Sequence, residues 1–309
     1  MAITEKQRAA RAEGLGASDI PTILGLNRWG NVHDLWLEKT GRLEPTPETT
    51  DIDAAEVGTH IESTIRTLAE KRLVAKLVKP TATFVAPNGI MRANVDFMVG
   101  KAQRGAPIVE AKSTGQLDEW DGGERLPDKV LVQVAAQFVC AGSDAAYVAA
   151  IFGRFGLTFR LFPLERDADM ARLCAIVEET AVDWWRKHVE TDTPPDVAPS
   201  IEAARMIRRE TGKSCTIADE LVEAWLRAKG EADEASYLES QAKANVLAAM
   251  GDAQIGVCGA GEVRVKSIDS RRIDSDKLRL SYPDAARECT KVSTSTRVTW
   301  HENKDASNG

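Results

Sequence analysis

The chain has 309 residues, of which 43% are hydrophobic and 28% are charged, and its formal net charge is −7. This composition is sufficient for a buried core and excludes an intrinsically disordered chain. No run of about 18 apolar residues is present, so no membrane span is expected. The opening residues Met1–Lys6 lack the apolar core of a secretory signal.

Cysteine usage and charge narrow the class of protein further. The five cysteines are dispersed and form no Cys-x-x-Cys pair, which disfavours a zinc or iron–sulfur site and indicates a reducing, cytoplasmic compartment. The acidic net charge argues only weakly against a nucleic-acid partner. A metal-binding carboxylate cluster is itself acidic, and a local basic surface can lie within an acidic whole.

The first part of the chain predicts two short helices and then a long one. Ser18 is suited to cap a helix over Asp19–Leu26, and Asn31 is suited to cap a second helix over Val32–Thr40. Apolar residues at helical spacing predict a long helix over Asp53–Val78.

Three strands are predicted next, near residues 82–86, 90–99 and 107–112. Turn signals separate them, at Pro87–Gly89 and again at Gly100–Gly105. The pattern therefore predicts a short antiparallel arrangement directly after the long helix.

Helices and strands alternate through the remainder of this part. A helix is expected from Asp128 to Gly142, and two strands are expected over Ala145–Phe152 and Leu157–Leu164. A further amphipathic helix is expected over Arg166–Val189. This order is typical of an α/β domain.

The proline-containing segment Thr191–Ser200 predicts a domain boundary, with one domain over residues 1–195 and an extension over residues 201–309. Apolar residues over 217–249 recur at three- and four-residue steps, which predicts one long helix with a continuous apolar stripe. Packing of this stripe on the main domain or on its own hairpin is favoured over self-association. Strand-like runs within Ile255–Trp300 predict a β-hairpin.

Two neighbouring predicted strands carry the residues with the most chemical information. Glu110 and Lys112 alternate with Ala111 on one strand, so their side chains point to the same face. If this strand pairs with the preceding one, Asp96 lies beside them, and two carboxylates and an ammonium can hold a divalent cation and position a water. Glu-x-Lys usually marks two solvated charges, but the flanking apolar residues favour buried strands, where unpaired charges are costly.

A series of segments over about residues 8–197 occurs in an order and at a spacing that resemble one known family. The matching segments are Arg11–Ile20, Ile23–Asn27, Leu35–Gly41, Gly58–Glu62, Asn94–Asp96, Glu110–Lys112, Trp120, Pro127, Gln133, Glu165–Asp167 and Pro194-Pro195. The chain resembles the YqaJ-like viral recombinases, phage-type nucleases related to lambda exonuclease within the PD-(D/E)xK superfamily. The resemblance implies an α/β, restriction-endonuclease-like core: a central mixed sheet flanked by helices, extended here by the C-terminal long helix and β-hairpin.

The chain departs from the family pattern near the predicted glutamine helix. After Pro127 the family usually has an aromatic residue before the glutamine, where this chain has Val130. A second family glutamine would fall at Ala135, whereas this chain has Gln137. Neither change removes a metal ligand, so both concern the positioning of the glutamine helix.

The resemblance implies a role for each residue of the predicted metal site. Asp96 and Glu110 supply hard anionic oxygens, and with the main-chain carbonyl of Ala111 they suit Mg²⁺ or Mn²⁺. Lys112 holds the attacking water or neutralises charge that gathers on the phosphate oxygens. Glu62, which alone would be an exposed helix charge, becomes an outer or water-mediated metal ligand.

The remaining implied roles concern positioning and substrate ends. Gln133 orients the water or Lys112, and Gln137, one turn later on the same face, is a weaker candidate. Arg11 and Ser18 form an anion site that receives the terminal 5′-phosphate of DNA in similar exonucleases.

From these residues we expect a Mg²⁺-dependent DNA exonuclease. It would degrade linear double-stranded DNA from 5′ ends and leave 3′ single strands for recombination. Expected partners are double-stranded DNA ends and a single-strand annealing protein, and similar exonucleases form homo-oligomeric rings. We expect the cytoplasm of a bacterial host and a phage or prophage origin.

Alternatives remain open at this point. An endonuclease or a nuclease of opposite polarity would use the same fold. From another class, the chain could be a catalytically inactive DNA-end-binding or assembly module. A Cas4-like iron–sulfur nuclease is disfavoured because its cysteine cluster is absent.

Overall fold

The computed structural model describes residues 13–43, 52–153, 157–268, 270, 273–290 and 298–299. The chain divides into two compact units, Met1–Arg208 and Arg209–Gly309. The sequence predicts the division slightly earlier, in the proline-containing segment. That segment is followed by α7 (Ile201–Met206) and by a β-bridge from Ile207 to Leu43, which attach it to the first unit.

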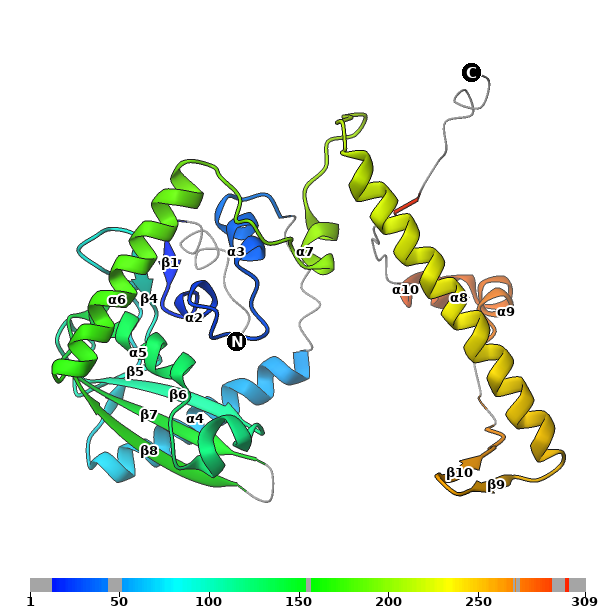
Figure 1. The fold of residues 1–309 in the computed structure, drawn as a ribbon. Helices are drawn as coiled ribbons and strands as arrows, with labels where there is room; N and C mark the ends of the chain where they lie inside the picture. The colour runs from blue at the N-terminus through cyan, green and yellow to red at the C-terminus, as the bar shows by residue number, and fades with distance from the viewer. Residues whose placement is uncertain are drawn as a thin grey trace. The chain divides into compact units, whose positions relative to one another are not determined.

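A five-stranded mixed sheet forms the centre of the first unit, in the order β2-β5-β6-β7-β8 (Figure 1). Its strands are β2 (Leu77–Val78), β5 (Phe97–Val99), β6 (Ile108–Thr114), β7 (Ala145–Phe152) and β8 (Thr158–Glu165). β6 and β7 are parallel, whereas the other neighbouring strands are antiparallel. The predicted α/β class with a central mixed sheet is confirmed.

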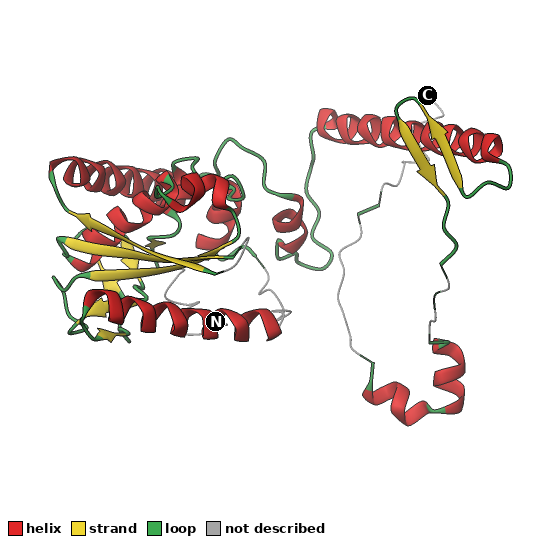
Figure 2. Cartoon of the chain, turned by 90° about the horizontal axis from the view of Figure 1, so that it is seen from below, coloured by secondary structure: helices red, strands yellow, loops and turns green. Residues whose placement is uncertain are grey.

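Helices cover both faces of this sheet (Figure 2). On one face, α4 (Ile52–Leu73) buries Ile65 and Ala69 against Val109 and its neighbours. On the other face, α5 (Asp128–Ala141) and α6 (Ala168–Trp184) pack over a cluster that includes Ile108. Adjacent strand residues such as Ile108 and Val109 therefore enter different cores, because strand side chains alternate between faces.

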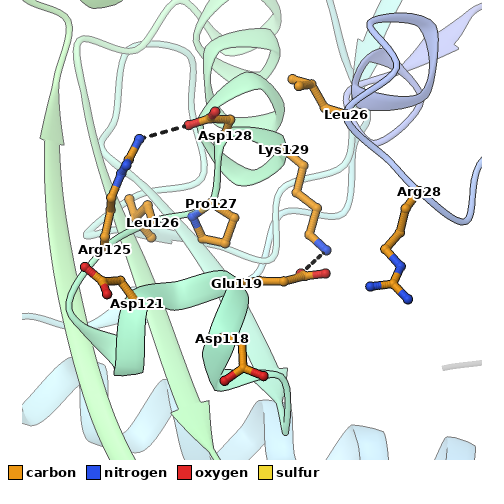
Figure 3. Close-up of a pocket in the computed structure, with 10 residues that line it drawn as sticks. All are labelled: Leu26, Arg28, Asp118, Glu119, Asp121, Arg125, Leu126, Pro127, Asp128 and Lys129. Atoms are coloured by element: carbon orange, nitrogen blue, oxygen red, sulfur yellow. Dashed lines mark hydrogen bonds and ion pairs between the residues drawn. The ribbon is translucent and has the colours of Figure 1, made fainter.

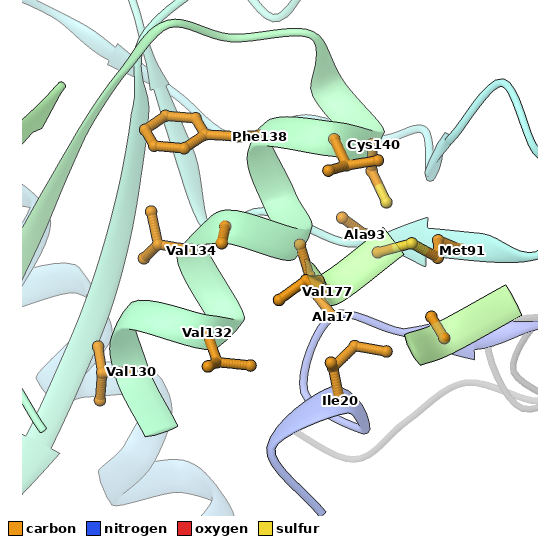
Figure 4. Close-up of a cluster of buried hydrophobic side chains, with 14 of the residues drawn as sticks. Ala17, Ile20, Met91, Ala93, Val130, Val132, Val134, Phe138, Cys140 and Val177 are labelled. Carbon is orange, nitrogen blue, oxygen red and sulfur yellow. The ribbon is translucent and has the colours of Figure 1, made fainter. Parts of the chain in front are cut away.

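The α5 helix is apolar on nearly all sides, as expected for a helix buried within a core. Figure 4 shows Val130, Val134 and Phe138 on one side of α5 and Val132 on the other, toward Ile20. Gly142 ends the helix in the left-handed conformation, with φ 65°. The polar residues of α5 that face the sheet are consequently held in fixed positions.

A small sheet with the order β1-β4-β3 lies beside the main one. Its strands are β1 (Leu15–Gly16), β3 (Phe84–Val85) and β4 (Met91–Ala93); β1 runs parallel to β4. Gly14 lies so close to β4 that an added Cβ would be 2.2 Å from the carbonyl oxygen of Ile90. Only glycine therefore fits without moving β1.

Two short helices follow β1, namely α2 (Ile20–Ile23) and α3 (Val32–Lys39). The predicted cap of α3 is confirmed, because the Asn31 side chain accepts bonds from the main-chain N–H groups of His33 and Asp34. The prediction that Ser18 caps α2 is wrong. The residue before α2 is Asp19, and its side chain makes no capping bond.

The other predicted limits need two corrections. The long helix ends at Leu73 rather than Val78; Val74 has φ 49°, which is strained for a β-branched residue, and the chain then enters β2. The strand predicted over 90–99 is interrupted between β4 and β5, so residues 94–96 belong to neither strand. The second correction concerns the site directly, because Asp96 lies in the interruption.

Past α6 the chain continues as a short π-helix, η2 (Trp185–Glu190). Beyond η2 and α7, the second unit contains the predicted long helix and hairpin: α8 (Asp219–Met250) and the antiparallel strands β9 (Ile255–Cys258) and β10 (Gly261–Arg264). Two short helices follow, α9 (Ser275–Ser281) and α10 (Pro283–Glu288). None of the helices in the described part of the chain is long and apolar enough to cross a lipid bilayer.

Candidate functional site

The candidate site lies where β5 and β6 separate. The two strands pair only through Phe97 with Val109 and through Met98 with Ile108, although β6 continues to Thr114. Asp96 lies directly before Phe97 in the chain, and its Oδ2 accepts a hydrogen bond from the main-chain N–H of Ala111 at 2.8 Å. The Asp96 carboxylate therefore takes the place of the main-chain carbonyl that a paired strand would offer to the Ala111 N–H. On an extended strand the N–H and C=O of one residue point to the same side, so the Ala111 carbonyl also faces this opening.

Glu110 and Lys112 point to the opposite face from Val109, toward α5. Lys112 Nζ lies 2.7 Å from Glu110 Oε1 and donates to Gln133 Oε1 at 2.9 Å. Gln133 Nε2 in turn donates to Glu110 Oε1 at 2.7 Å. The structure thus brings together three residues that the sequence placed on two separate elements.

Gln137 completes the surroundings of Glu110. Its side chain is fully buried, and its Nε2 donates to Glu110 Oε2 at 2.5 Å. The amide oxygen of Gln137 is buried without a hydrogen-bond partner. The sequence ranked Gln137 below Gln133, yet both glutamines hold the same carboxylate, one at each oxygen.

The protonation of Asp96 is strongly perturbed. Burial, the charge of Glu110 and, to a smaller extent, the charge of Glu62 raise the pKa of Asp96 from 3.8 to about 7, against the opposing effects of the Ala111 N–H and Lys112. A second carboxylate nearby disfavours ionisation because like charges repel in a site shielded from water. Such a site is electrostatically suited to a cation.

Glu62 approaches the site from the other side of the sheet. It belongs to α4, and its Oε1 forms an ion pair with Lys79 Nζ at 2.6 Å. Across the described residues, no three His, Cys, Asp or Glu side chains gather closely enough to hold a metal ion. The oxygens of Asp96 and Glu110 and the Ala111 carbonyl are hard donors of the kind that Mg²⁺ and Mn²⁺ bind, so these residues could hold a divalent cation.

The predicted end-binding residues are only partly described. Arg11 lies outside the described residues, and Ser18 is exposed. The neighbouring Asp19 accepts the main-chain N–H of Gly16 at 2.8 Å and forms an ion pair at 2.7 Å with Lys39, whose side chain is fully buried. This buried contact fixes the turn on which Ser18 is exposed.

A cavity of about 590 Å³ is formed by the loop after α2, by η1 (Leu117–Gly123) and by the start of α5 (Figure 3). Two of its cations are paired within it, Arg125 with Asp128 and Lys129 with Glu119. Arg28 also lines the cavity.

The side chain of Arg28 was not among the residues predicted from the sequence. Its Cζ lies 4.4 Å from the ring centroid of Trp29, and Trp29 is 72% exposed. The pair therefore presents a cation and an aromatic ring together at the surface. Arginine and tryptophan are adjacent in the sequence, but their stacking and exposure are visible only in three dimensions. Trp120, in contrast, is buried against Phe152.

An aspartate at the opening of a mixed sheet, beside a Glu-x-Lys strand, is the arrangement expected from the resemblance to PD-(D/E)xK nucleases. Residues 8–144 match the model of the YqaJ-like viral recombinase domain. This match confirms, over these residues, the resemblance to that family inferred from the sequence.

Relatives and solved structures show how far the similarity extends. The chain is 29% identical over 297 residues to the uncharacterized protein YqaJ of Bacillus subtilis (strain 168), covering 91% of this chain and 89% of that protein. It is similar to the alkaline exonuclease LHK-Exo of Laribacter hongkongensis, with 17% identity, a TM-score of 0.49, and coverage of 62% of this chain and 94% of that one. For a phage-related exonuclease of Haemophilus somnus 129PT the identity is 12%, the TM-score 0.32, and the coverage 61% and 85%.

Proposed function

We propose that the protein is a divalent-metal-dependent deoxyribonuclease that removes nucleotides from the ends of linear double-stranded DNA. The observation that carries this proposal is the hydrogen-bonded group of Glu110, Lys112 and Gln133 beside Asp96. Two carboxylates, a lysine and a positioning amide are the parts that metal-assisted phosphodiester hydrolysis needs. A cation bound by Asp96 and Glu110 would polarise the scissile phosphate and lower the pKa of a bound water.

Each side chain has a distinct task in this proposal. Lys112 presents an ammonium at the mouth of the site, where it offsets the charge that develops on the phosphate oxygens. Gln133 forms hydrogen bonds with both Lys112 and Glu110, so it fixes the position of the Lys112 ammonium relative to the Glu110 carboxylate. The Ala111 N–H holds the Asp96 carboxylate toward the same opening.

We further propose that degradation starts at 5′ ends and leaves 3′ single strands for recombination. Arg11 and the exposed Ser18 support this polarity, since an arginine fork and a hydroxyl suit a terminal phosphate. Arg28 and its cavity provide a further cationic contact for the DNA backbone. A single-strand annealing protein would use the product, and several copies of the chain would assemble around the DNA as a ring.

The test is to incubate the protein and Mg²⁺ with linear duplexes labelled at the 5′ or the 3′ terminus, alongside a covalently closed circle. The proposal expects early release of the 5′ label, late release of the 3′ label and an intact circle. Cutting of the circle would establish an endonuclease instead, and early release of the 3′ label would reverse the polarity. Lys112→Ala serves as the control for contaminating nucleases.

A catalytically inactive DNA-end-binding module is the second candidate. It would bind duplex ends without cleaving any substrate in Mg²⁺ or Mn²⁺. The Glu110–Lys112–Gln133 group disfavours this function, because burying the Glu110 carboxylate has a desolvation cost that DNA binding does not require.

A further inference from the structure

Within the second unit, the long helix α8 presents an apolar stripe that no other described element of that unit buries. None of its 32 residues is buried, and Leu221, Trp225 and Val246 are 66%, 40% and 43% exposed. Steps of four and three residues alternate along the stripe, which has eight apolar positions and one charged position, Glu239. The apolar positions are Leu221, Trp225, Ala228, Ala232, Ala235, Ala242, Val246 and Ala249. This heptad pattern is the one by which two helices pack along their whole length.

We propose that α8 pairs in an antiparallel manner with α8 of a second copy of this chain. The heptad pattern is suited to a helix as the partner, and α8 is about 48 Å long at about 1.5 Å per residue. The other described helices of this unit, α9 and α10, have 7 and 6 residues and are too short to cover it. A strip about 48 Å long and about 10 Å wide on each copy corresponds to roughly 1,000 Å² in total, which reaches the lower limit for a biological interface.

Side-chain sizes select the antiparallel orientation. In a parallel pair, Trp225 would face Trp225 and Glu239 would face Glu239, so two carboxylates would be buried together. In an antiparallel pair that crosses at Ala235, each Trp225 fits between Ala242 and Ala249 of the second copy. The small alanines in the middle allow the two backbones to approach closely.

The charges of the helix favour the same orientation. Residues 219–234 contain six carboxylates and two cationic side chains, whereas residues 235–250 contain one of each. A parallel pair would place the two acidic halves side by side. An antiparallel pair places each acidic half beside a neutral half, which removes most of the repulsion.

A matched pair of substitutions tests the association. Ala242→Glu places a charge in the stripe, whereas Ala244→Glu places the same residue on the outer face of the same helix. Sedimentation equilibrium of the full-length protein should show reversible self-association of the wild type and of Ala244→Glu. The association of Ala242→Glu should be weakened at least about tenfold. Circular dichroism would show whether both variants keep their helix.

Three outcomes of this experiment would overturn the proposal. A wild-type protein that stays monomeric across the concentration range has no such interface. Equal weakening in both variants would place the association elsewhere. A lower stability of Ala242→Glu without any change in mass would show that the stripe packs within its own chain.

Disulfide trapping tests the orientation in a background in which the exposed Cys215, Cys258 and Cys289 are replaced by serine. A mixture of Leu221→Cys chains and Ala249→Cys chains should give a mixed disulfide dimer. Leu221→Cys alone should give none. A Leu221–Leu221 cross-link in place of the mixed one would contradict the antiparallel pair. This inference does not depend on the proposed nuclease activity, because mass and cross-linking are measured without DNA.

Discussion

The buried amide of Gln137 donates from Nε2 to Glu110 Oε2 at 2.5 Å, while its own oxygen has no partner. A buried acceptor without a donor has a free-energy cost of about 1–3 kcal/mol. Gln137 is therefore a poor choice for stability alone. Its position is explained by what it does to Glu110, whose second oxygen it orients.

Gln137→Met tests this relationship, because methionine has a similar shape but neither donates nor leaves an unpaired oxygen. The free energy of unfolding should fall by at most about 1–3 kcal/mol, because the buried Glu110 Oε2 loses its donor while the unpaired amide oxygen is removed. The affinity for Mg²⁺, measured by thermal shift or calorimetry, should fall about 10- to 100-fold. Unchanged metal affinity would show that Gln137 only fills space.

Lys112→Ala should reduce DNA cleavage by about 10²- to 10³-fold, because a cation aimed at the developing charge is removed. Binding of duplex DNA should persist, since the cationic side chains proposed to contact DNA outside the metal site remain. Cleavage is measured in single turnover, and binding is measured by fluorescence anisotropy in a chelator. Lys101→Ala, at an exposed loop position, is the matched control. Normal cleavage by Lys112→Ala would mean that the site has been wrongly assigned.

Asp96 makes the stability of the metal-free protein depend on pH. Its pKa is raised from 3.8 to about 7, mainly by burial, so the folded state binds more protons than the unfolded state between these values. The stabilising contribution is present in full below the unfolded pKa and is lost as the pH rises through the folded pKa. The loss is at most about 4 kcal/mol.

Asp96→Asn keeps an acceptor for the Ala111 N–H but removes this titration. In urea unfolding with a chelator, the variant should be more stable than the wild type at about pH 8, and the difference should disappear near pH 4. Mg²⁺ should raise the melting temperature of the wild type at about pH 8 and leave that of Asp96→Asn unchanged. Parallel stability curves for the two proteins would refute the raised pKa.

Arg11→Ala should slow degradation of duplexes that carry a 5′-phosphate by about 10- to 100-fold, as expected for loss of a charge-assisted hydrogen bond. Degradation of 5′-hydroxyl ends should be unchanged, and Ser18→Ala should show a smaller effect of the same kind. Initial rates on the two substrates give the ratio. Arg8→Ala, in the same segment, is the control. Equal slowing on both kinds of end would rule out a phosphate pocket.

Arg28→Ala should weaken duplex binding at low salt and reduce the slope of log affinity against log salt by about one, because one phosphate contact is lost. Arg172→Ala on α6, another exposed arginine, should leave the slope unchanged. Anisotropy titrations at several salt concentrations measure both. An unaltered slope in Arg28→Ala would show that the cavity does not face the DNA.

Local patterns were sufficient to predict much of the site. Strand alternation alone places Glu110 and Lys112 on one face, because neighbouring strand positions always point apart. Helical periodicity and the family resemblance together place Gln133 on a helix that crosses that face. These predictions depend only on the spacing of residues along a single strand or helix, and this spacing can be read from the sequence.

The remaining features depend on contacts between distant segments. Ser18 and Asp19 are both good capping residues, but Asp19 is held by Gly16 and by the buried Lys39, a contact that no local pattern shows. The interruption before Phe97 looks like continuous strand in the sequence, since only the position of the partner strand decides where pairing stops. The sequence likewise ranks Gln137 below Gln133, because no local pattern shows its contact with Glu110, 27 residues away in the chain.

Gly14 imposes a constraint on how this sequence can change over time. Any other residue would place a Cβ against the Ile90 carbonyl and displace β1 from β4, the strand that leads directly to Asp96. In a library of random variants selected for activity, position 14 should therefore accept glycine alone, whereas the exposed neighbour Glu13 should vary freely. A residue with no reactive group would be as strictly retained as the carboxylates themselves.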